Sequence, residues 1–298
     1  MKILTIGSSG QVAQAMNERS VKAGVQNESI GRPTLDILRP ESIEIAIDRA
    51  EPTIIVNAAA YTAVDRAEDD PGSVFELNAN APEHLAKVAN ARGIPLVHIS
   101  TDYVFDGKNA DPYREDDSIA PLGVYGQSKA QGERKVLEAS PRSLILRTAW
   151  VYSPFGNNFV KTMLKLAAER ESVSVVDDQV GNPTNALDIA DGILSICEHL
   201  GQQGGNVAYG LYHMTARGRA SWADLAEKDF DVYRQETGKT VHLNRISSSE
   251  YPTPVERPNN SQLDSEKLAN TFSVTLPEWK TSVEAVVRRL ISERNTSQ

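Results

Sequence analysis

A tyrosine and a lysine four residues apart, Tyr125 and Lys129, are the residues of this sequence best suited to proton transfer. In a helix, side chains four positions apart lie on one face. An ammonium group close to a phenol favours the phenolate, so Lys129 is expected to lower the pKa of Tyr125 from about 10 toward neutrality. Tyr125 could then exchange a proton with the oxygen of an alcohol or a ketone.

A threonine hydroxyl is expected beside this pair. Residues 95–100 have the composition of a buried strand, and Thr101 follows its carboxyl end. Ligands bind at that edge of a parallel sheet, so Thr101 could donate a second hydrogen bond to the same substrate oxygen. A Tyr-x-x-x-Lys pair also arises by chance, and it indicates an enzyme only if a cofactor site lies beside it.

The first residues of the chain supply a candidate cofactor site. A short apolar strand at 2–6 runs into Gly7-Ser-Ser-Gly10-Gln11-Val12-Ala13, and apolar residues at helical spacing follow. Backbone N–H groups at the start of such a helix can bind a pyrophosphate. The alternative is a glycine-containing turn that binds nothing. Ala13 stands where glycine is commonest, and its single methyl group should be tolerated.

Arg32 bears on the choice of cofactor. It follows a second predicted strand, about 27–31, where NAD-binding proteins usually have an acidic residue for the adenosine ribose. A guanidinium there would bind the 2'-phosphate of NADP. We therefore expect NADP(H) to be favoured and NAD(H) to be accepted as well. A solvated surface role for Arg32 is the alternative.

Strands that alternate with helices across the first half predict an α/β fold with a doubly wound, parallel, Rossmann-like sheet. Further strands are expected at 53–57 and 143–148. We divide the chain into a cofactor-binding domain, 1–150, and a smaller α/β substrate-binding domain, 151–298. An apolar stripe predicts a helix over 185–200 that packs back on the first domain. It makes Cys197 a core residue rather than a nucleophile.

Composition narrows the class of protein. The chain has 298 residues, a net charge of −9 and a single cysteine. The acidic balance argues against a nucleic-acid partner, and the absence of a long apolar run argues against a membrane protein. One cysteine without a signal peptide predicts a cytoplasmic protein. The spacing of histidines, cysteine and carboxylates predicts no metal site.

Several motifs, taken in order, resemble the extended short-chain dehydrogenases/reductases: the glycine turn, Asn57-Ala-Ala-Ala60, Ser100-Thr101 and Tyr125-x-x-x-Lys129. More narrowly, segments 56–65, 100–105, 147–152, 156–159, 178–184 and 257–263 resemble the dTDP-4-dehydrorhamnose reductases. The resemblance covers nearly the whole chain. It implies NAD(P)H-dependent reduction of the C4 keto group of dTDP-4-dehydro-L-rhamnose to dTDP-L-rhamnose, for cell-surface polysaccharide such as O-antigen.

The resemblance also implies roles for single residues. Thr101, Tyr125 and Lys129 match the catalytic triad, and Lys129 would hold the nicotinamide ribose as well. The other matched positions are Gly7, Gly10, Gln11 and Val12 for the pyrophosphate, Asp36 and Ile37 for adenine, Ala60, Tyr61 and Thr62 along the cofactor, and Thr101, Asp102, Tyr125 and Trp150 for the sugar. Asp36 could equally cap a helix that begins at Pro40.

Magnesium and a homodimer are implied by the resemblance alone. Ala15 stands where a glutamate of the family is linked to a magnesium-bridged dimer, which puts the metal in doubt.

Three other functions are weighed against reduction of this sugar. A dehydratase of the same superfamily would need an acid after Asp102, where this chain has Tyr103. A reductase of another nucleotide-linked 4-keto sugar stays open. So does a non-catalytic subunit resembling the regulatory subunit of methionine adenosyltransferase, although the intact triad favours an enzyme.

Overall fold

The computed structural model describes residues 1–202 and 207–296. Its main feature is a six-stranded sheet in the order β10-β5-β4-β3-β1-β2, in which every neighbouring pair is parallel. The expected doubly wound α/β fold is confirmed. The strands are β1 (Lys2–Ile6), β2 (Gln26–Ile30), β3 (Ile54–Asn57), β4 (Leu96–Thr101), β5 (Ser143–Thr148) and β10 (Gly210–His213).

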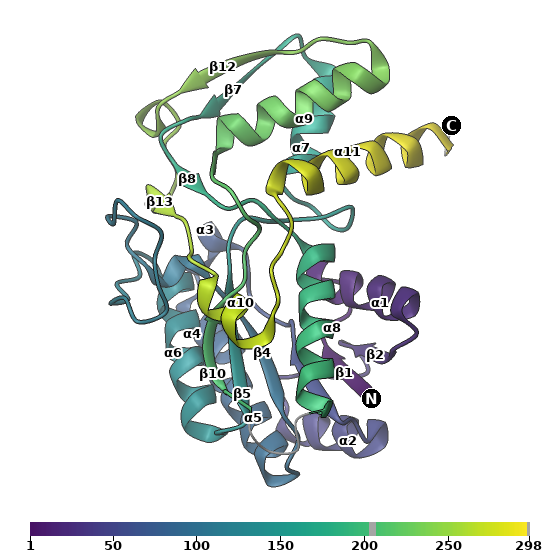
Figure 1. Ribbon diagram of the computed structural model, residues 1–298. Coiled ribbons are helices and arrows are strands. Elements are labelled where there is room, and N and C mark those ends of the chain that lie inside the picture. Colours follow the sequence, from purple (N-terminus) through teal and green to yellow (C-terminus); the bar gives the residue numbers. More distant parts are fainter. Residues whose placement is uncertain (203–206, 297–298) are drawn as a thin grey trace.

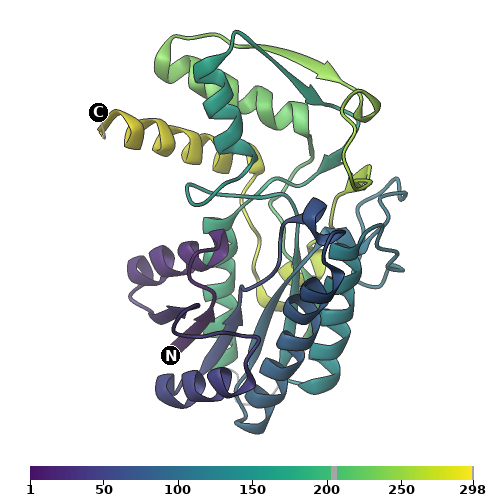
Figure 2. The ribbon, with the colours of Figure 1, turned by 180° about the vertical axis from the view of Figure 1, so that it is seen from behind.

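Side chains that alternate along these strands build a core on each face of the sheet. On β1, Ile3 belongs to the core under α1 and α8, whereas Leu4 belongs to the core under α2, α5 and α6. Figures 1 and 2 show these two helical layers from opposite sides. The helices are α1 (Gln11–Ala23), α2 (Pro40–Ala50), α5 (Ala81–Ala91), α6 (Val124–Ala139) and α8 (Ala186–Gln202).

The segment from α8 to β10 returns to the large sheet. Helix α8 packs on α1, and β10 pairs with β5 as the sixth strand. Cys197 on α8 is fully buried in the apolar core, as its stripe predicted. The division of the chain near residue 150 into a cofactor part and a sugar part stays a prediction.

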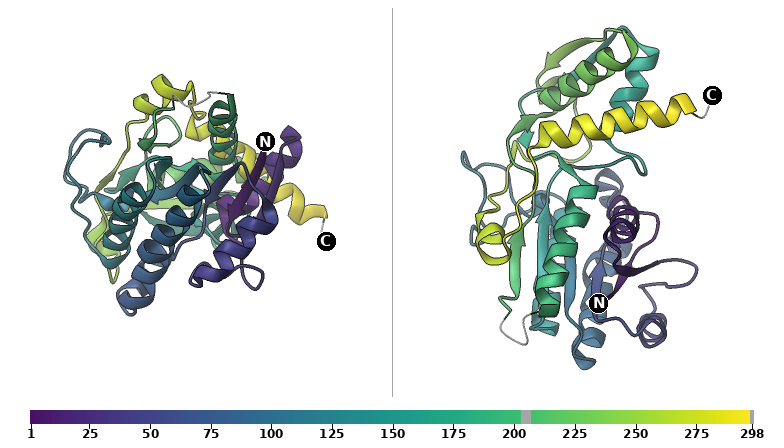
Figure 3. Two further views of the ribbon diagram at one scale, coloured as in Figure 1. Left: turned by 90° about the horizontal axis from the view of Figure 1, so that it is seen from below. Right: turned by 45° about the vertical axis from the view of Figure 1, so that its right-hand side comes forward.

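A smaller lobe lies above the carboxyl edge of the sheet (Figure 1). The parallel pair β7 and β12 packs with α7, α9 and α11 around a separate apolar core. Figure 3 shows α11, in yellow, between this lobe and α8. The bounds are β7 (Ser172–Val176), β12 (His242–Ile246), α7 (Phe159–Glu169), α9 (Trp222–Thr237) and α11 (Trp279–Thr296).

Short elements connect the two parts. Strand β8 pairs with β11 and β13, and β6 pairs with β9. Their bounds, with those of the small helices, are β6 (Val151–Tyr152), β8 (Val180–Gly181), β9 (Thr184–Asn185), β11 (Ala220–Ser221), β13 (Asn260–Ser261), α3 (Val64–Ala67), α4 (Pro71–Phe75) and α10 (Glu266–Phe272). Within the described residues, no helix combines the length and apolarity needed to span a membrane.

Candidate active site

The three expected catalytic residues meet at the carboxyl edge of the sheet. Thr101 is the last residue of β4, and Tyr125 and Lys129 lie on successive turns at the start of α6. Tyr125 is 9% exposed and Lys129 is 2% exposed, so both side chains are withdrawn from bulk water. A hydrogen bond links Tyr125 with Thr101. The arrangement places a phenol beside a hydroxyl at the carboxyl edge of the sheet, with the amino group of Lys129 one helical turn further along, and this set of groups suits a carbonyl reduction.

Two glycines let α6 come close enough to form this arrangement. A Cβ atom on Gly126 would lie 2.2 Å from the carbonyl oxygen of Tyr103, and one on Gly132 would lie 2.1 Å from that of Asn78. Any side chain would push the helix away. Glycine inside a helix costs about 1 kcal/mol relative to alanine, so its presence at both positions reflects this close packing.

The expectation that Lys129 lowers the pKa of Tyr125 is wrong for this structure. Burial raises the pKa of the phenol, Asp102 and Tyr103 add to the rise, and the hydrogen bond with Thr101 opposes it. The amine of Lys129 donates instead to the carbonyl oxygen of Ile99 at 2.7 Å. Tyr125 therefore holds its proton at neutral pH and is suited to donate it.

A buried ion pair anchors α6 to the sheet one turn beyond Lys129. Glu133 accepts two hydrogen bonds from the guanidinium of Arg147 on β5, at 2.9 and 2.7 Å. It also accepts one from the hydroxyl of Ser100 on β4. Both partners of the pair are almost fully buried. Removing one partner would leave a buried charge, so this pair fixes the helix that carries Tyr125 and Lys129.

Asp102 is a buried carboxyl group next to Thr101. It is 3% exposed, and its Oδ1 accepts a hydrogen bond from the Thr101 hydroxyl at 2.9 Å. Its Oδ2 has no hydrogen-bond partner among the described residues. Burial raises the pKa of Asp102 to about 6, although hydrogen bonds from Ser261 and Thr101 oppose the rise.

The glycine turn has the geometry of a dinucleotide site. Gly7 has φ +115°, which favours glycine, and Gly10 is the N-cap of α1. No atom lies within 4 Å of a Cβ built on Gly10, so its surface is open to a ligand. Gln11 and Val12 open α1, whose first N–H groups point toward this space.

Gln11 also joins the glycine turn to the segment that follows β5. Its side-chain amide donates to the carbonyl oxygen of Val151 at 3.2 Å. Its carbonyl oxygen accepts from the Ser153 hydroxyl at 2.7 Å and from the Asn158 amide at 3.0 Å. The start of α1 is therefore tied to the start of the smaller lobe.

The loop after β2 carries both Arg32 and Asp36. Arg32 is exposed, and it precedes a cis peptide bond to Pro33. Asp36 lies 3.9 Å from Arg39, and its Oδ1 accepts from the backbone of Leu38. The N-cap of α2 is Arg39, so the interpretation of Asp36 as the cap of that helix is wrong. Ile37 of the same loop is buried beneath it.

The segment after β3 is held by one side chain that the sequence analysis missed. Ala60, Tyr61 and Thr62 follow β3, and Asn78 binds both the backbone N–H and the carbonyl of Tyr61, at 2.8 and 3.1 Å. Asn78 also donates to the Ser128 hydroxyl on α6 at 3.0 Å. It lies in a π-helical turn, Glu76–Asn80, between α4 and α5. It links the expected cofactor segment to α6, the helix that carries Tyr125 and Lys129.

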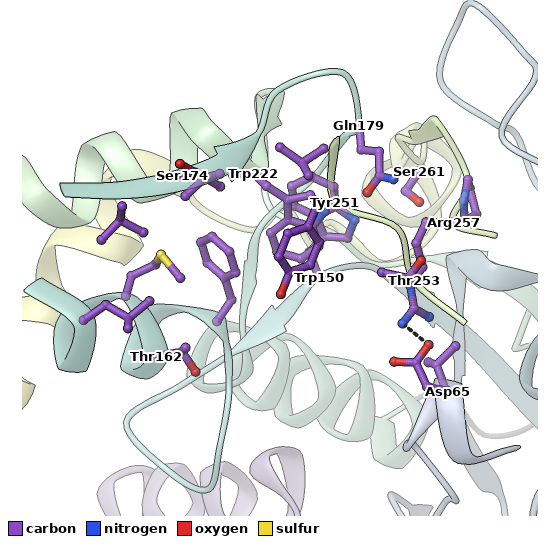
Figure 4. A pocket seen from close by; sticks show the side chains of 18 of the residues that line it. Asp65, Trp150, Thr162, Ser174, Gln179, Trp222, Tyr251, Thr253, Arg257 and Ser261 are labelled. Carbon is purple, nitrogen blue, oxygen red and sulfur yellow. Dashed lines mark hydrogen bonds and ion pairs between the residues drawn. The ribbon is translucent and has the colours of Figure 1, made fainter. Parts of the chain in front are cut away.

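A cavity of about 820 Å³ lies between the sheet edge and the smaller lobe. Trp150 and Thr62 line it, and Trp150 stacks on Trp222 with ring centroids 3.6 Å apart (Figure 4). Trp150 has φ +48°, a conformation that is uncommon outside glycine. A Cβ on Gly181 would lie 2.6 Å from the Trp150 ring, so this glycine makes room for the indole.

Arg257, on the cavity wall, forms an ion pair with a residue from the first part of the chain. Arg257 binds Asp65 at 2.6 Å, as Figure 4 shows, and its guanidinium lies 5.9 Å from the ring centre of Tyr103. Its Nη1 is buried without a hydrogen-bond partner among the described residues. A guanidinium beside a cavity can bind an anionic group.

The family model described as RmlD substrate binding domain matches residues 1–292. This chain belongs to that family. A dTDP-4-dehydrorhamnose reductase of Sinorhizobium fredii is 42% identical over 293 residues, covering 98% of this chain and 99% of the relative.

Two solved family structures share the whole fold. One is a dTDP-4-dehydrorhamnose reductase of Clostridium acetobutylicum, with a TM-score of 0.89, 34% identity, and coverage of 98% of this chain and 100% of that chain. The other, from Bacillus anthracis, was solved in complex with NADP. It has a TM-score of 0.88, 32% identity, and coverage of 97% and 100%.

The magnesium site that the family resemblance implied finds no support at Ala15. This residue is fully buried, and it packs in the apolar core beneath α8. Within residues 1–202 and 207–296, no group of three or more histidine, cysteine or carboxylate side chains could hold a metal ion.

Proposed function

We propose that this chain uses NADPH to reduce the C4 keto group of dTDP-4-dehydro-L-rhamnose to dTDP-L-rhamnose, for cell-surface polysaccharide. The observation that supports it is the meeting of Thr101, Tyr125 and Lys129 at the sheet edge. A glycine turn opens on one side of them, and a cavity with a tryptophan wall lies on the other. Membership of the family supplies the substrate class.

The residues around the glycine turn fit a nicotinamide dinucleotide. The open surface of Gly10 and the N–H groups of Gln11 and Val12 suit its pyrophosphate. When bound, the nicotinamide supplies a hydride to C4. The relative solved with NADP supports NADPH as the favoured form, and we propose that NADH is also used. The adenosine end is assigned to Arg32, Asp36 and Ile37, and the segment along the cofactor to Ala60, Tyr61 and Thr62.

The chain's own residues handle the proton. Tyr125 donates its phenolic proton to the C4 oxygen as negative charge develops there, since burial keeps the phenol protonated. Thr101, whose hydroxyl donates to Asp102 in this structure, turns its single proton to the same oxygen when the sugar is bound. Lys129 holds the ribose next to the nicotinamide, and Asp102 accepts a hydrogen bond from a sugar hydroxyl.

The cavity is assigned to the nucleotide-linked sugar. Trp150 forms an apolar wall against the sugar ring, and Arg257 offers a guanidinium to the diphosphate. Phe159, which lies against Trp222 on the cavity wall, presents an aromatic face on which a thymine could stack. All assigned cofactor residues precede residue 150, in keeping with the proposed division of the chain. Only the family resemblance suggests a homodimer.

A substrate panel tests this function. NADPH oxidation is followed with dTDP-4-dehydro-L-rhamnose, with a dTDP-linked 4-keto sugar of different stereochemistry, and with a UDP-linked 4-keto sugar. We expect kcat/KM to be highest for the first compound. Equal or faster turnover of another sugar would reassign the substrate. No turnover with any of them, despite NADPH binding, would favour the non-catalytic alternative.

A further inference from the structure

A chain of three buried side chains leads from β3 to the catalytic lysine. Asn57, the last residue of β3, lies 3.0 Å from Nδ1 of His98 through its amide nitrogen. On the other side of the imidazole, Nε2 of His98 lies 3.3 Å from Nζ of Lys129. Asn57 and His98 are both 0% exposed. The residues assigned above to the chemistry include neither of them.

The hydrogen bonds determine which ring nitrogen of His98 carries the proton. The backbone N–H of Ala59 donates to Oδ1 of Asn57 at 3.1 Å, and a backbone N–H can only donate. This fixes the amide orientation, so the Asn57 amino group faces Nδ1, which must accept. Burial holds the pKa of His98 well below its usual range and the ring is neutral. The single proton therefore sits on Nε2 and points at Lys129.

An Nε2–H donor next to Lys129 favours the amine over the ammonium form. An ammonium has three donors and no acceptor, and among the described residues only the carbonyl of Ile99, at 2.7 Å, accepts one of them. The amine can donate to Ile99 and accept from His98 at the same time. Burial, the larger effect, lowers the pKa of Lys129 to about 8, while Glu133 opposes the fall.

Other charged groups around Lys129 do not reverse this preference. Glu133, one turn along α6, is neutralised by its pair with Arg147 on β5. Tyr125, one turn earlier, keeps its proton because burial raises its pKa. His98 is the titratable group that β4 presents to Nζ.

We propose that Asn57 and His98 are positioning residues for Lys129. The imidazole, locked with its proton on Nε2, disfavours the ammonium form of Lys129 in the free protein. Hydrogen-bond acceptors of the bound cofactor then stabilise that ammonium form. The inference rests on the proposed function, because Lys129 is assigned there to the ribose. Its consequence is that NADPH binding takes up a proton at moderately alkaline pH. No sugar substrate is needed to observe this.

The test is the pH dependence of the NADPH dissociation constant, measured by fluorescence titration. In the parent protein, we expect constant affinity below about pH 8 and a fall of up to about tenfold per pH unit above it. His98→Gln offers Lys129 a carbonyl acceptor, so the pH at which affinity begins to fall, the break in the curve, should rise by about one unit. The matched control is His213→Gln, a buried histidine on β10 that binds the carbonyls of Tyr113 and Asp264. It should keep the parent's break.

A second measurement keeps the proposal testable if His98→Gln fails to fold. The ¹⁵N spectrum of the parent's histidine side chains distinguishes the two tautomers. A proton on Nδ1 of His98, or an unchanged break in a folded His98→Gln protein, would overturn the proposal. Failure of the parent to bind NADPH would instead overturn the proposed function, while the tautomer result would still decide the position of the proton.

Discussion

The buried phenol of Tyr125 stays protonated and can act as a general acid. Because burial raises its pKa, it remains protonated across the neutral range, and a reduction needs that proton at the carbonyl oxygen. We expect Tyr125→Phe to lower kcat by about 100-fold or more and to leave NADPH affinity nearly unchanged. Tyr212→Phe on the edge strand β10 is the matched control, since it removes a hydroxyl that binds the carbonyl of Ala208, which precedes that strand. Near-normal turnover of Tyr125→Phe would remove this residue from the mechanism.

Asp102 makes stability depend on pH. Its pKa of about 6 in the folded protein lies above the usual 3.8, so the folded state binds the proton more tightly and stability falls as pH rises between these values. We expect Asp102→Asn to raise the free energy of unfolding by about 1 to 3 kcal/mol at neutral pH. The gain should vanish near pH 4, as urea unfolding at the two pH values would show.

A neighbouring carboxylate gives the opposite sign and serves as the control for Asp102→Asn. Hydrogen bonds from the Lys108 backbone and the Tyr113 hydroxyl lower the pKa of Asp106. Asp106→Asn should therefore destabilise the protein at neutral pH. A gain for Asp102→Asn that is the same at both pH values would contradict the role given to its titration.

Arg32 is expected to set the cofactor preference. The guanidinium is exposed, and Asp36 lies within ion-pair distance of Arg39 instead, so Arg32 is available for a 2'-phosphate. Such a contact is worth about 1.5 to 3 kcal/mol, or roughly a 10- to 150-fold preference for NADPH over NADH. Arg32→Ala should reduce the ratio of the two kcat/KM values, whereas Arg39→Ala in the same loop should not. An unaltered ratio in Arg32→Ala would assign this arginine to the solvated surface.

At the scale of elements, α6 is the part with least room for change. Its glycines touch the carbonyls of Tyr103 and Asn78, and its far side is fixed by the ion pair of Glu133 with Arg147. The helix cannot move toward or away from β4 without breaking one of these contacts. The positions of Tyr125 and Lys129 are therefore set by packing and by a buried ion pair.

Gly132→Ala tests this rigidity. The added methyl would overlap the carbonyl oxygen of Asn78, so we expect a loss of about 1 to 3 kcal/mol in the free energy of unfolding and a fall in kcat. Gly201→Ala on α8 is the control, because no atom lies within 4 Å of a Cβ there. That change should be neutral or stabilise by up to about 1 kcal/mol. Equal effects of the two substitutions would mean that α6 adjusts freely.

At the scale of the whole molecule, most features of the fold were predicted from short sequence patterns. The glycine turn, the Tyr-x-x-x-Lys spacing and the alternation of apolar strands with helices are short local signals, and they predicted a doubly wound parallel sheet, although not its sixth strand. Strand β10 was harder to assign to that sheet, because four residues far along the chain do not show which strand they will pair with.

The supporting contacts of the site could not be predicted in the same way. Asn78, His98 and Glu133 act on segments distant in sequence, and nothing in their immediate neighbours shows which segment that is. The prediction that Lys129 lowers the pKa of Tyr125 was wrong for a related reason. Spacing indicates that Lys129 shares its helix face, but burial and the competing carbonyl of Ile99 depend on the assembled fold.

The stacked indoles of Trp150 and Trp222 give the molecule an optical reporter. Two parallel rings 3.6 Å apart couple their electronic transitions, which produces a paired circular dichroism band that isolated tryptophans lack. The third tryptophan, Trp279, is buried and donates to the carbonyl of Arg219, so it contributes a constant background. Trp222→Phe should abolish the paired band without any ligand. In the parent, a dTDP-sugar that enters the cavity should change the paired band. Circular dichroism would then report substrate binding separately from hydride transfer.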